Sequence, residues 1–255
     1  MVKFNTEDAK PKANVGSGLG FETVDDTMEG FEQITQATMA IPFIRILQKL
    51  SPQLDKQEAA YLEEAEEGNF FNTITKEVYG SSFDCIVLKY EHIYIEWRPD
   101  RGGFVGYHSV ENAERISVDK TFGKWKTEDG NLLQENYVYL ILIEGREKEG
   151  IIVFSLSSSM IKMAREWNRL MTTHIFENGE KAMPYYLVWH IQTEYKSNEK
   201  GNWYIPIVNF SSYIGPKQYQ ILQRERKILP SRQVDYAQLG THETTEDKFD
   251  EKTEF

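Results

Sequence analysis

The stretch YYLVWHIQTEYK (residues 185–196) alternates between apolar and other side chains over most of its length. Successive side chains of a β-strand point to opposite faces. The odd-numbered residues from Tyr185 to Ile191 are therefore expected to face a core, and His190 the other side. Turn-forming residues at 198–201 and a second aromatic, β-branched run at 203–210 predict a hairpin. We expect the fold to be an antiparallel sheet that ends in this hairpin.

Residues before the hairpin show the same strand pattern four more times. The expected strands are 85–97, 104–107, 137–144 and 151–156. A helix is predicted over residues 158–173, where a serine cap precedes an apolar stripe that includes Trp167 and Met171. A last helix is predicted over residues 216–229. Its basic side chains are Lys217, Arg224, Arg226 and Lys227.

Several strands, one helix and two further strands are the order of an oligonucleotide-binding (OB) barrel, a small closed sheet whose loops hold single strands. We predict an α+β, β-rich fold with an OB-fold-like antiparallel barrel, an inserted helix, an N-terminal helical segment and disordered ends. The expected parts are a flexible acidic arm (1–38), a helical lead-in that packs on the barrel (39–83), an OB-like domain (84–230) and a disordered acidic tail (231–255).

The lead-in is expected to contain two helices. Apolar residues recur at spacings of three and four between Met39 and Leu50, which predicts an amphipathic helix with Pro42 in its first turn. Residues 55–67 predict a second, short and acidic helix. Its glutamate cluster indicates a solvated face rather than a metal site.

Charge is unevenly distributed along the 255 residues, whose net charge is −11. Residues 1–68 carry 13 acidic and 6 basic side chains, residues 239–255 carry 6 and 2, and the rest balance at 21 of each. The neutral middle therefore leaves nucleic acid open as a ligand.

A single cysteine, Cys85, excludes an internal disulfide, and neither a signal-peptide segment nor an apolar run of bilayer length is found. We expect a cytoplasmic protein without membrane contact. The five histidines show no paired spacing and no phosphate-binding loop motif occurs. No catalytic residue, metal site or cofactor is predicted.

Binding of single-stranded nucleic acid without sequence preference needs exposed aromatic faces for the bases and cations for the phosphates. Two segments, at 97–107 and 120–126, combine both, and the turn of the last hairpin adds a third. The candidate DNA-binding residues are Trp97, Arg98, Arg101, Phe104, Tyr107, Lys120, Phe122, Lys124, Trp125, Lys126, Tyr195, Lys196 and Trp203. In each segment the alternative is that the rings are buried and the cations simply solvated.

The last residues, 243–255, are acidic and polar and end in a phenylalanine. They are too poor in apolar residues to fold. A terminal ring beside a carboxylate suits a basic, apolar pocket on a partner. The candidate partner-binding residues are Asp250, Glu251, Glu254 and Phe255. The alternative is a solubilising tail.

The order of the strands together with this tail resembles the single-stranded DNA-binding proteins of bacteriophages. The segment IPFIRILQKLSPQ (residues 41–53) is also similar to the opening of a phage family of this kind. The resemblance implies a protein that coats single-stranded DNA during phage replication and recombination in the host cytoplasm. It further implies a tail that recruits a polymerase, helicase or primase and shields the DNA groove when it is empty. Unlike the bacterial relatives, this chain has extra residues before the barrel and lacks their long linker. These differences leave the oligomeric state open.

Two other classes remain open from the sequence. Asp100 with Glu194 and Lys196 contains the elements of a magnesium-dependent nuclease, in which carboxylates hold the metal. A virion or regulatory protein that binds other proteins through its acidic ends is the third reading. Cleavage that depends on magnesium and is lost in Asp100→Ala would indicate the nuclease.

Overall fold

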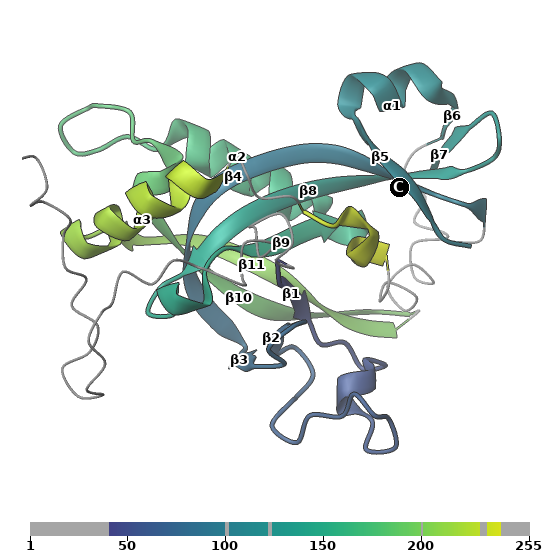
Figure 1. Cartoon of the computed structure of the whole chain (residues 1–255), viewed down its shortest axis with the longest axis horizontal. Coiled ribbons are helices and arrows are strands. Elements are labelled where there is room, and N and C mark those ends of the chain that lie inside the picture. Colours follow the sequence, from purple (N-terminus) through teal and green to yellow (C-terminus); the bar gives the residue numbers. More distant parts are fainter. Residues whose placement is uncertain (1–40, 100–101, 122–123, 200, 230–233, 241–255) are drawn as a thin grey trace, which may run out of the picture. The chain divides into compact units, whose positions relative to one another are not determined.

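A curled, mixed β-sheet organises the residues that the computed structural model describes, which are 41–99, 102–121, 124–199, 201–229 and 234–240. All of them belong to one compact unit that begins at Ala40. The longest strands bend along their length, so that the sheet forms a half barrel (Figure 1). Helices pack on this sheet, which confirms the predicted β-rich α+β class.

Five strands form the central path of the sheet, in the order β11-β10-β4-β8-β9, and each is antiparallel to its neighbours. Their bounds are β4 (Ser82–Trp97), β8 (Leu132–Ile143), β9 (Ile152–Ser157), β10 (Leu187–Asn198) and β11 (Gly201–Tyr213). These strands match the predicted ones, although β8 starts five residues earlier. Leu187, Trp189 and Ile191 are buried in one core cluster, as predicted. Tyr185, predicted to face the same core, instead lies in a 3₁₀ helix before β10 and packs half-buried against another cluster.

Three short strands extend this path beyond β9, and here the predicted helices are wrong. β1 (Phe43–Ile46) runs parallel to β9 and pairs with β2 (Phe70–Asn72), which pairs with β3 (Val78–Gly80). Phe43 and Ile44 are buried on opposite faces of the sheet, in different core clusters. In so short a strand, apolar residues on both faces can recur at spacings of three and four, as they do in a helix.

The predicted acidic helix at 55–67 is also absent, because these residues form successive turns. Single bonds from Glu58 N to Asp55 O and from Tyr61 N to Glu58 O close two of them. Without an apolar stripe, the segment has no tertiary packing to stabilise a helix.

Two helices pack on opposite faces of the sheet, as the two core clusters show. α2 (Ile161–Thr173) places Trp167 and Met171 in the first cluster, with Tyr139 and Trp189. α3 (Pro216–Ile228) places Leu222 in the second cluster, with residues of the opposite sheet face. Both helices were predicted from their sequence patterns.

A register shift between Val87 and Lys89 reverses the faces of β4 partway along its length. Before the shift, odd-numbered residues such as Cys85 lie in the first core cluster. After it, the odd-numbered residues Ile93 and Ile95 lie in the second. A bulge adds one residue to a strand, so every later side chain changes face. The even-numbered side chains of the second half of β4 therefore lie on the same face as α2.

The residues between β4 and β8 form a small lobe of their own. Its elements are β5 (Phe104–Ser109), α1 (Val110–Ile116), β6 (Ser117–Thr121) and β7 (Lys124–Thr127). Ser109 caps α1, since its hydroxyl accepts a hydrogen bond from Asn112 N at 3.2 Å. Only β5 was predicted, and residues 120–126, for which no strand was predicted, lie largely in the β6–β7 hairpin.

Short 3₁₀ helices join the larger elements. They are η1 (Pro52–Leu54), η3 (Glu147–Glu149), η4 (Ser158–Met160) and η5 (Pro184–Tyr186).

A further 3₁₀ helix, η7 (Tyr236–Gly240), follows α3. It lies in the segment expected to be a disordered tail (231–255), but Tyr236 and Leu239 are buried in the second core cluster. This part of the expected tail is therefore ordered.

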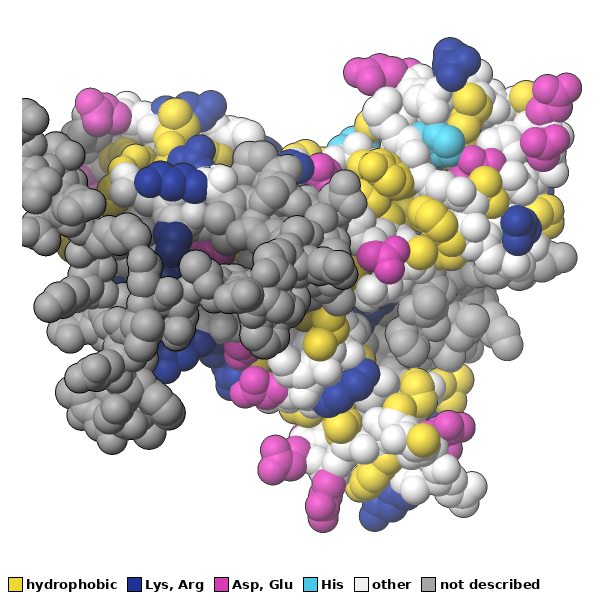
Figure 2. Space-filling model, in the orientation of Figure 1, with side chains coloured by type: hydrophobic (Ala, Val, Ile, Leu, Met, Phe, Trp, Pro, Cys, Tyr) yellow, Lys and Arg dark blue, Asp and Glu magenta, His cyan; other side chains and the backbone are white. Residues whose placement is uncertain are grey.

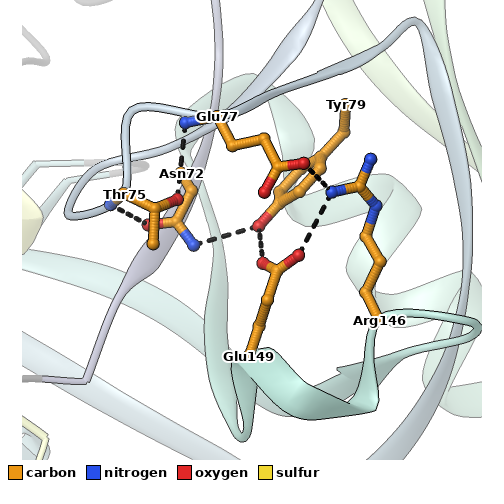
Figure 3. Close-up of polar contacts among 6 residues, drawn as sticks. All are labelled: Asn72, Thr75, Glu77, Tyr79, Arg146 and Glu149. Carbon is orange, nitrogen blue, oxygen red and sulfur yellow. Dashed lines mark hydrogen bonds and ion pairs between the residues drawn. The ribbon is translucent and has the colours of Figure 1, made fainter. Parts of the chain in front are cut away.

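A polar cluster fastens the β2–β3 hairpin to η3 (Figure 3). The hydroxyl of Tyr79 donates to Glu149 and accepts from Asn72 Nδ2 at 3.0 Å. Arg146 pairs with Glu77 and with Glu149, and its guanidinium lies 4.8 Å from the centroid of the Tyr79 ring. Burial, followed by the bond to Glu149, raises the pKa of Tyr79. We read this cluster as a structural clamp on the hairpin at the edge of the sheet.

Gln48 joins the end of β1 to the edge strand β11. Its side-chain amide donates to Tyr204 O and accepts from Tyr204 N, both at 2.9 Å, as a neighbouring strand would. Gly68, with a φ of +81°, lies against the Tyr204 ring so closely that a Cβ would come within 2.6 Å of it. These contacts bring the two sides of the curled sheet together.

Gln48→Ala is expected to lower the free energy of unfolding by about 1–3 kcal/mol, because it leaves the backbone groups of Tyr204 without this partner. Urea denaturation measures the change. Lys49→Ala, at the exposed neighbouring position, is the control and should stay within about 0.5 kcal/mol of the parent. Equal stability of the two variants would contradict a structural role for Gln48.

Candidate nucleic-acid interface

Aromatic side chains follow one another along one face of the sheet. After the bulge, Tyr90, His92 and Tyr94 of β4 point to the same face. The register places Tyr137 of β8 opposite His92. Trp125 of β7 is paired with Leu133 of β8, close to the end of the same row. We call these five residues the aromatic ladder.

The rings of the ladder are in contact from one end to the other. Tyr90 lies 6.1 Å from Tyr137 between ring centroids, and Tyr137 stacks on His92 at 4.4 Å. His92 is 5.9 Å from Tyr94, and Tyr94 stacks on Trp125 at 4.8 Å with an interplanar angle of 20°. Rings stacked in this way hold one another in fixed orientations.

Exposure divides the ladder into open and supporting rings. Tyr90 is 38% exposed, and His92 and Trp125 are half-buried. Tyr94 and Tyr137 are buried. The open rings can meet a flat ligand, and the buried ones fix their positions.

Helices cover both ends of the ladder. At one end α2 packs on Tyr139, whose ring stacks on Trp167 at 4.2 Å. At the other end α1 contributes Ala113 to a third, small core cluster that includes Tyr94. Figure 1 shows β4 and β8 running between α2 and α1. Tyr90 and His92 therefore lie on the stretch of sheet between the two helices.

Two cations accompany the ladder. Lys120 of β6 lies 5.2 Å from the centroid of the Trp125 ring. Arg165 of α2 donates from Nε to the Tyr137 hydroxyl at 3.0 Å, and its Nη2 lies 3.3 Å from Glu135 Oε1. Arg165 remains largely exposed, and Lys120 is exposed as well. Both cations are accessible to phosphate groups.

Glu135 supplies the negative charge beside the ladder. Its Oε1 lies 2.9 Å from His92 Nε2. Burial alone would raise the pKa of Glu135, but hydrogen bonds from His92 and Tyr137 and the charge of Arg165 outweigh it and lower the pKa below its usual value. Glu135 is thus a carboxylate at neutral pH.

The tyrosines of the ladder keep their protons over the physiological range. Burial raises the pKa of Tyr90 and that of Tyr94 to about 12 each. Their hydroxyl groups are therefore uncharged at neutral pH, and they do not repel phosphate groups.

The first predicted segment lies mostly away from the ladder. Trp97 is buried in the second core cluster, where its Nε1 donates to Gln134 and its ring contacts Phe104 at 5.8 Å. Trp97 is thus closed to a base, and Phe104 is half-buried against the second core cluster, away from the ladder. Arg98 is exposed at the turn, and Arg101 lies outside the described residues.

Other predicted residues fall on the opposite face of the lobe. Tyr107 is 56% exposed, but its ring contacts Tyr236 of η7 at 4.5 Å, on the side of the second core cluster. Lys126 follows Trp125 in β7 and so points away from the ladder. Phe122 and the side chain of Lys124 lie outside the described residues. From this segment, the structure brings Lys120 and Trp125 to the ladder.

The third predicted group lies near the turn of the β10–β11 hairpin. Tyr195 is 53% exposed and contacts Tyr204 at 5.5 Å, Trp203 is half-buried, and Lys196 pairs with Glu194 at 2.7 Å. In the register, Gln192 meets Ser82 at the first residue of β4, and the turn lies beyond it. Trp97 is the last residue of β4. The turn of the β10–β11 hairpin and the first predicted segment (97–107) therefore lie near opposite ends of β4.

Sequence reasoning missed most of the ladder. Tyr90, His92 and Tyr94 lie inside a predicted strand, and their spacing of two was the signal that places them on one face. Tyr137 and Arg165 reach the ladder only through pairing and helix packing, which the sequence does not display.

Two further histidine–carboxylate pairs lie outside the ladder, His108 with Glu96 and His190 with Asp84, and the second of them lies near a serine. His190 Nδ1 is 2.6 Å from Asp84 Oδ1, and the Ser211 hydroxyl lies 3.4 Å from Asp84 Oδ2. A nucleophilic serine must instead contact the histidine. The geometry therefore does not activate Ser211.

The nuclease elements are only partly within the described residues. Glu194 and Lys196 pair with each other, and Asp100 lies outside. In the described part of the chain, no three His, Cys, Asp or Glu side chains are grouped to hold a metal ion. No described helix has the length and hydropathy needed to cross a membrane. The predicted tail residues, Asp250, Glu251, Glu254 and Phe255, lie outside the described residues.

A curled sheet, helices on both faces and a row of stacked rings flanked by cations define a β-rich α+β protein with an aromatic sheet surface. A model of the Pam3 phage gp34-like protein family matches residues 16–234, and the chain belongs to this family. The match confirms the expectation of a phage protein. No curated protein matches the chain closely enough to count as a relative.

Proposed function

We propose that this phage protein binds single-stranded DNA without sequence preference and that the aromatic ladder is its base-stacking surface. The observation that carries the proposal is the row of contacting rings with Lys120 at one end and Arg165 beside Tyr137. Every base has a π-face, so stacking on such rings tolerates any sequence.

The order of the strands supports an OB-type body for this function. Taken along the chain, β4, β8, β9, β10 and β11 are five strands, and α2 lies between the third and the fourth. In OB folds, the loops between strands one and two and between strands four and five hold oligonucleotides. Here the first of these connections is the lobe with Trp125 and Lys120. The second is the turn beside Tyr195.

The proposed contacts divide between bases and phosphates. Bases stack on the open rings of Tyr90, His92 and Trp125, while Lys120 and Arg165 meet the phosphates. For Arg165, a phosphate has to compete with Glu135, which lies 3.3 Å from its Nη2. We further propose that the acidic tail recruits replication proteins, as the resemblance to phage DNA-binding proteins implies.

Tryptophan fluorescence tests this site. Of the five tryptophans, Trp97, Trp167 and Trp189 are buried, so a stacked base is expected to quench Trp125 or Trp203. Oligo-dT should quench the parent protein and Trp203→Phe, while most of the quenching is lost in Trp125→Phe. Binding that leaves the quenching of Trp125→Phe unchanged would place the bases elsewhere.

A further inference from the structure

The exposed side of α3 is strongly basic. Lys217, Arg224, Arg226 and Lys227 are all exposed, and Glu225, the helix's acidic residue, is buried. Lys and Arg side chains gather over α3 on the face that Figure 2 shows. This helix is therefore a positively charged region in a chain whose net charge is −11.

Most of these cations lack a carboxylate partner. Arg224 pairs with Glu225 at 2.9 Å. Lys217, Arg226 and Lys227 form no ion pair with any carboxylate among the residues that the structure describes. Arg226 lies 4.1 Å from the centroid of the Tyr185 ring, which leaves its charge uncompensated. Unpaired cations on one surface attract a polyanion.

The helix is held firmly on the sheet. Leu222 is buried in the second core cluster. Gln218 donates from Nε2 to Glu144 at 2.7 Å and accepts from Gly215 N at 2.9 Å, which fixes the first turn. The cations therefore project from a fixed helix.

Aromatic rings lie beside the cations. Tyr219 is 38% exposed, and its ring is 6.0 Å from that of Tyr186. Tyr186 in turn contacts Tyr185, on which Arg226 packs. Cations next to partly exposed rings are the combination that single-stranded nucleic acid requires. An acidic protein segment would form ion pairs with the cations, but it has no bases to stack on the rings.

We infer that the basic side of α3 is a second binding surface for the phosphate backbone of single-stranded nucleic acid, separate from the aromatic ladder. This inference rests on the proposed function and extends it. Because α3 and the ladder lie on opposite faces of the sheet, we expect a short oligonucleotide to bind the ladder alone and only a long strand to reach both surfaces.

The test compares dT10 and dT60 by fluorescence anisotropy at several salt concentrations. The variant is Lys217→Gln/Arg226→Gln/Lys227→Gln. The control, Lys56→Gln/Lys148→Gln/Lys181→Gln, removes the same charge from exposed positions elsewhere. All six side chains are exposed, so both proteins should fold, and circular dichroism checks this.

Each phosphate contact on a single strand contributes about 0.7 to the slope of log affinity against log salt. For dT60, the slope of the α3 variant should be smaller by about 2. This corresponds to roughly 100-fold weaker binding at 0.1 M salt if both proteins bind alike at 1 M. Affinity for dT10 should be unchanged in both variants.

Two results would overturn the inference while the proposed function stands. One is parental affinity of the α3 variant for dT60, which would make an acidic protein the better candidate partner for α3. The other is an equal loss of dT60 affinity in the control, which would show that the effect comes from the net charge of the protein and not from α3. If the parent protein binds neither oligonucleotide, the proposed function and this inference both fail.

Discussion

Replacing Tyr90 and His92 together with alanine is expected to weaken the binding of short oligo-dT by roughly 30-fold or more. Stacking of one base on an aromatic side chain contributes about 1–3 kcal/mol, and the variant removes two of the open rings. Because Tyr94 and Tyr137 remain, the sheet beneath should persist. Fluorescence anisotropy with labelled dT10 measures the loss.

Two further variants show whether the rings themselves are responsible. Tyr90→Phe keeps the ring and removes the hydroxyl, so it should bind like the parent. Phe210→Ala removes an aromatic residue of matched exposure, 39% against 38% for Tyr90, from a different surface. It should also bind like the parent. An equal loss of affinity in Phe210→Ala, or parental affinity in the double variant, would show that the ladder is not part of the DNA-binding surface.

Trp167→Ala is expected to have the largest effect on stability, about 3–5 kcal/mol. Trp167 is fully buried where α2 meets the sheet, and its ring contacts Tyr139, Phe154 and Trp189 at centroid distances of 4.2, 6.4 and 6.2 Å. Trp167 Nε1 donates no hydrogen bond to any residue that the structure describes, so the cost comes from lost packing and the cavity.

Thermal and urea unfolding measure this change, with Arg169→Ala on the same helix as the control. Arg169 is exposed and pairs with Glu166, and such exposed pairs contribute little to stability because solvent screens them. If Trp167→Ala unfolds at the same urea concentration as Arg169→Ala, α2 is not a core element of the sheet.

The sequence predicted the elements that are long enough to show their pattern. The strand around Trp189 and the helix around Trp167 extend over twelve and thirteen residues. β1 was mistaken for a helix because it has only four residues, and the apolar residues Phe43, Ile46 and Leu47 recur at spacings of three and four. The short strands β2 and β3 have too few residues for a pattern.

Only part of the candidate site could be predicted from the sequence, for a different reason. The sequence drew attention to Lys120 and Trp125, where aromatic and basic residues are neighbours in the chain. The bulge between Val87 and Lys89 decides which face Tyr90 and His92 occupy, and it is a feature of the pairing that no local pattern announces. Trp97 and Phe104 looked equally suitable, but Trp97 is buried and Phe104 packs against the second core cluster, away from the ladder.

DNA binding itself is tested by titrating the parent protein with labelled oligo-dT and following anisotropy at low and at high salt. Saturable binding is expected in dilute buffer, and it should weaken steadily as salt rises, because phosphate contacts are exchanged for counterions. Mixed-sequence single strands should bind with equal affinity, and duplex of the same length, whose bases are already stacked, should bind more weakly. Absence of binding to single strands in dilute buffer would contradict the proposed function.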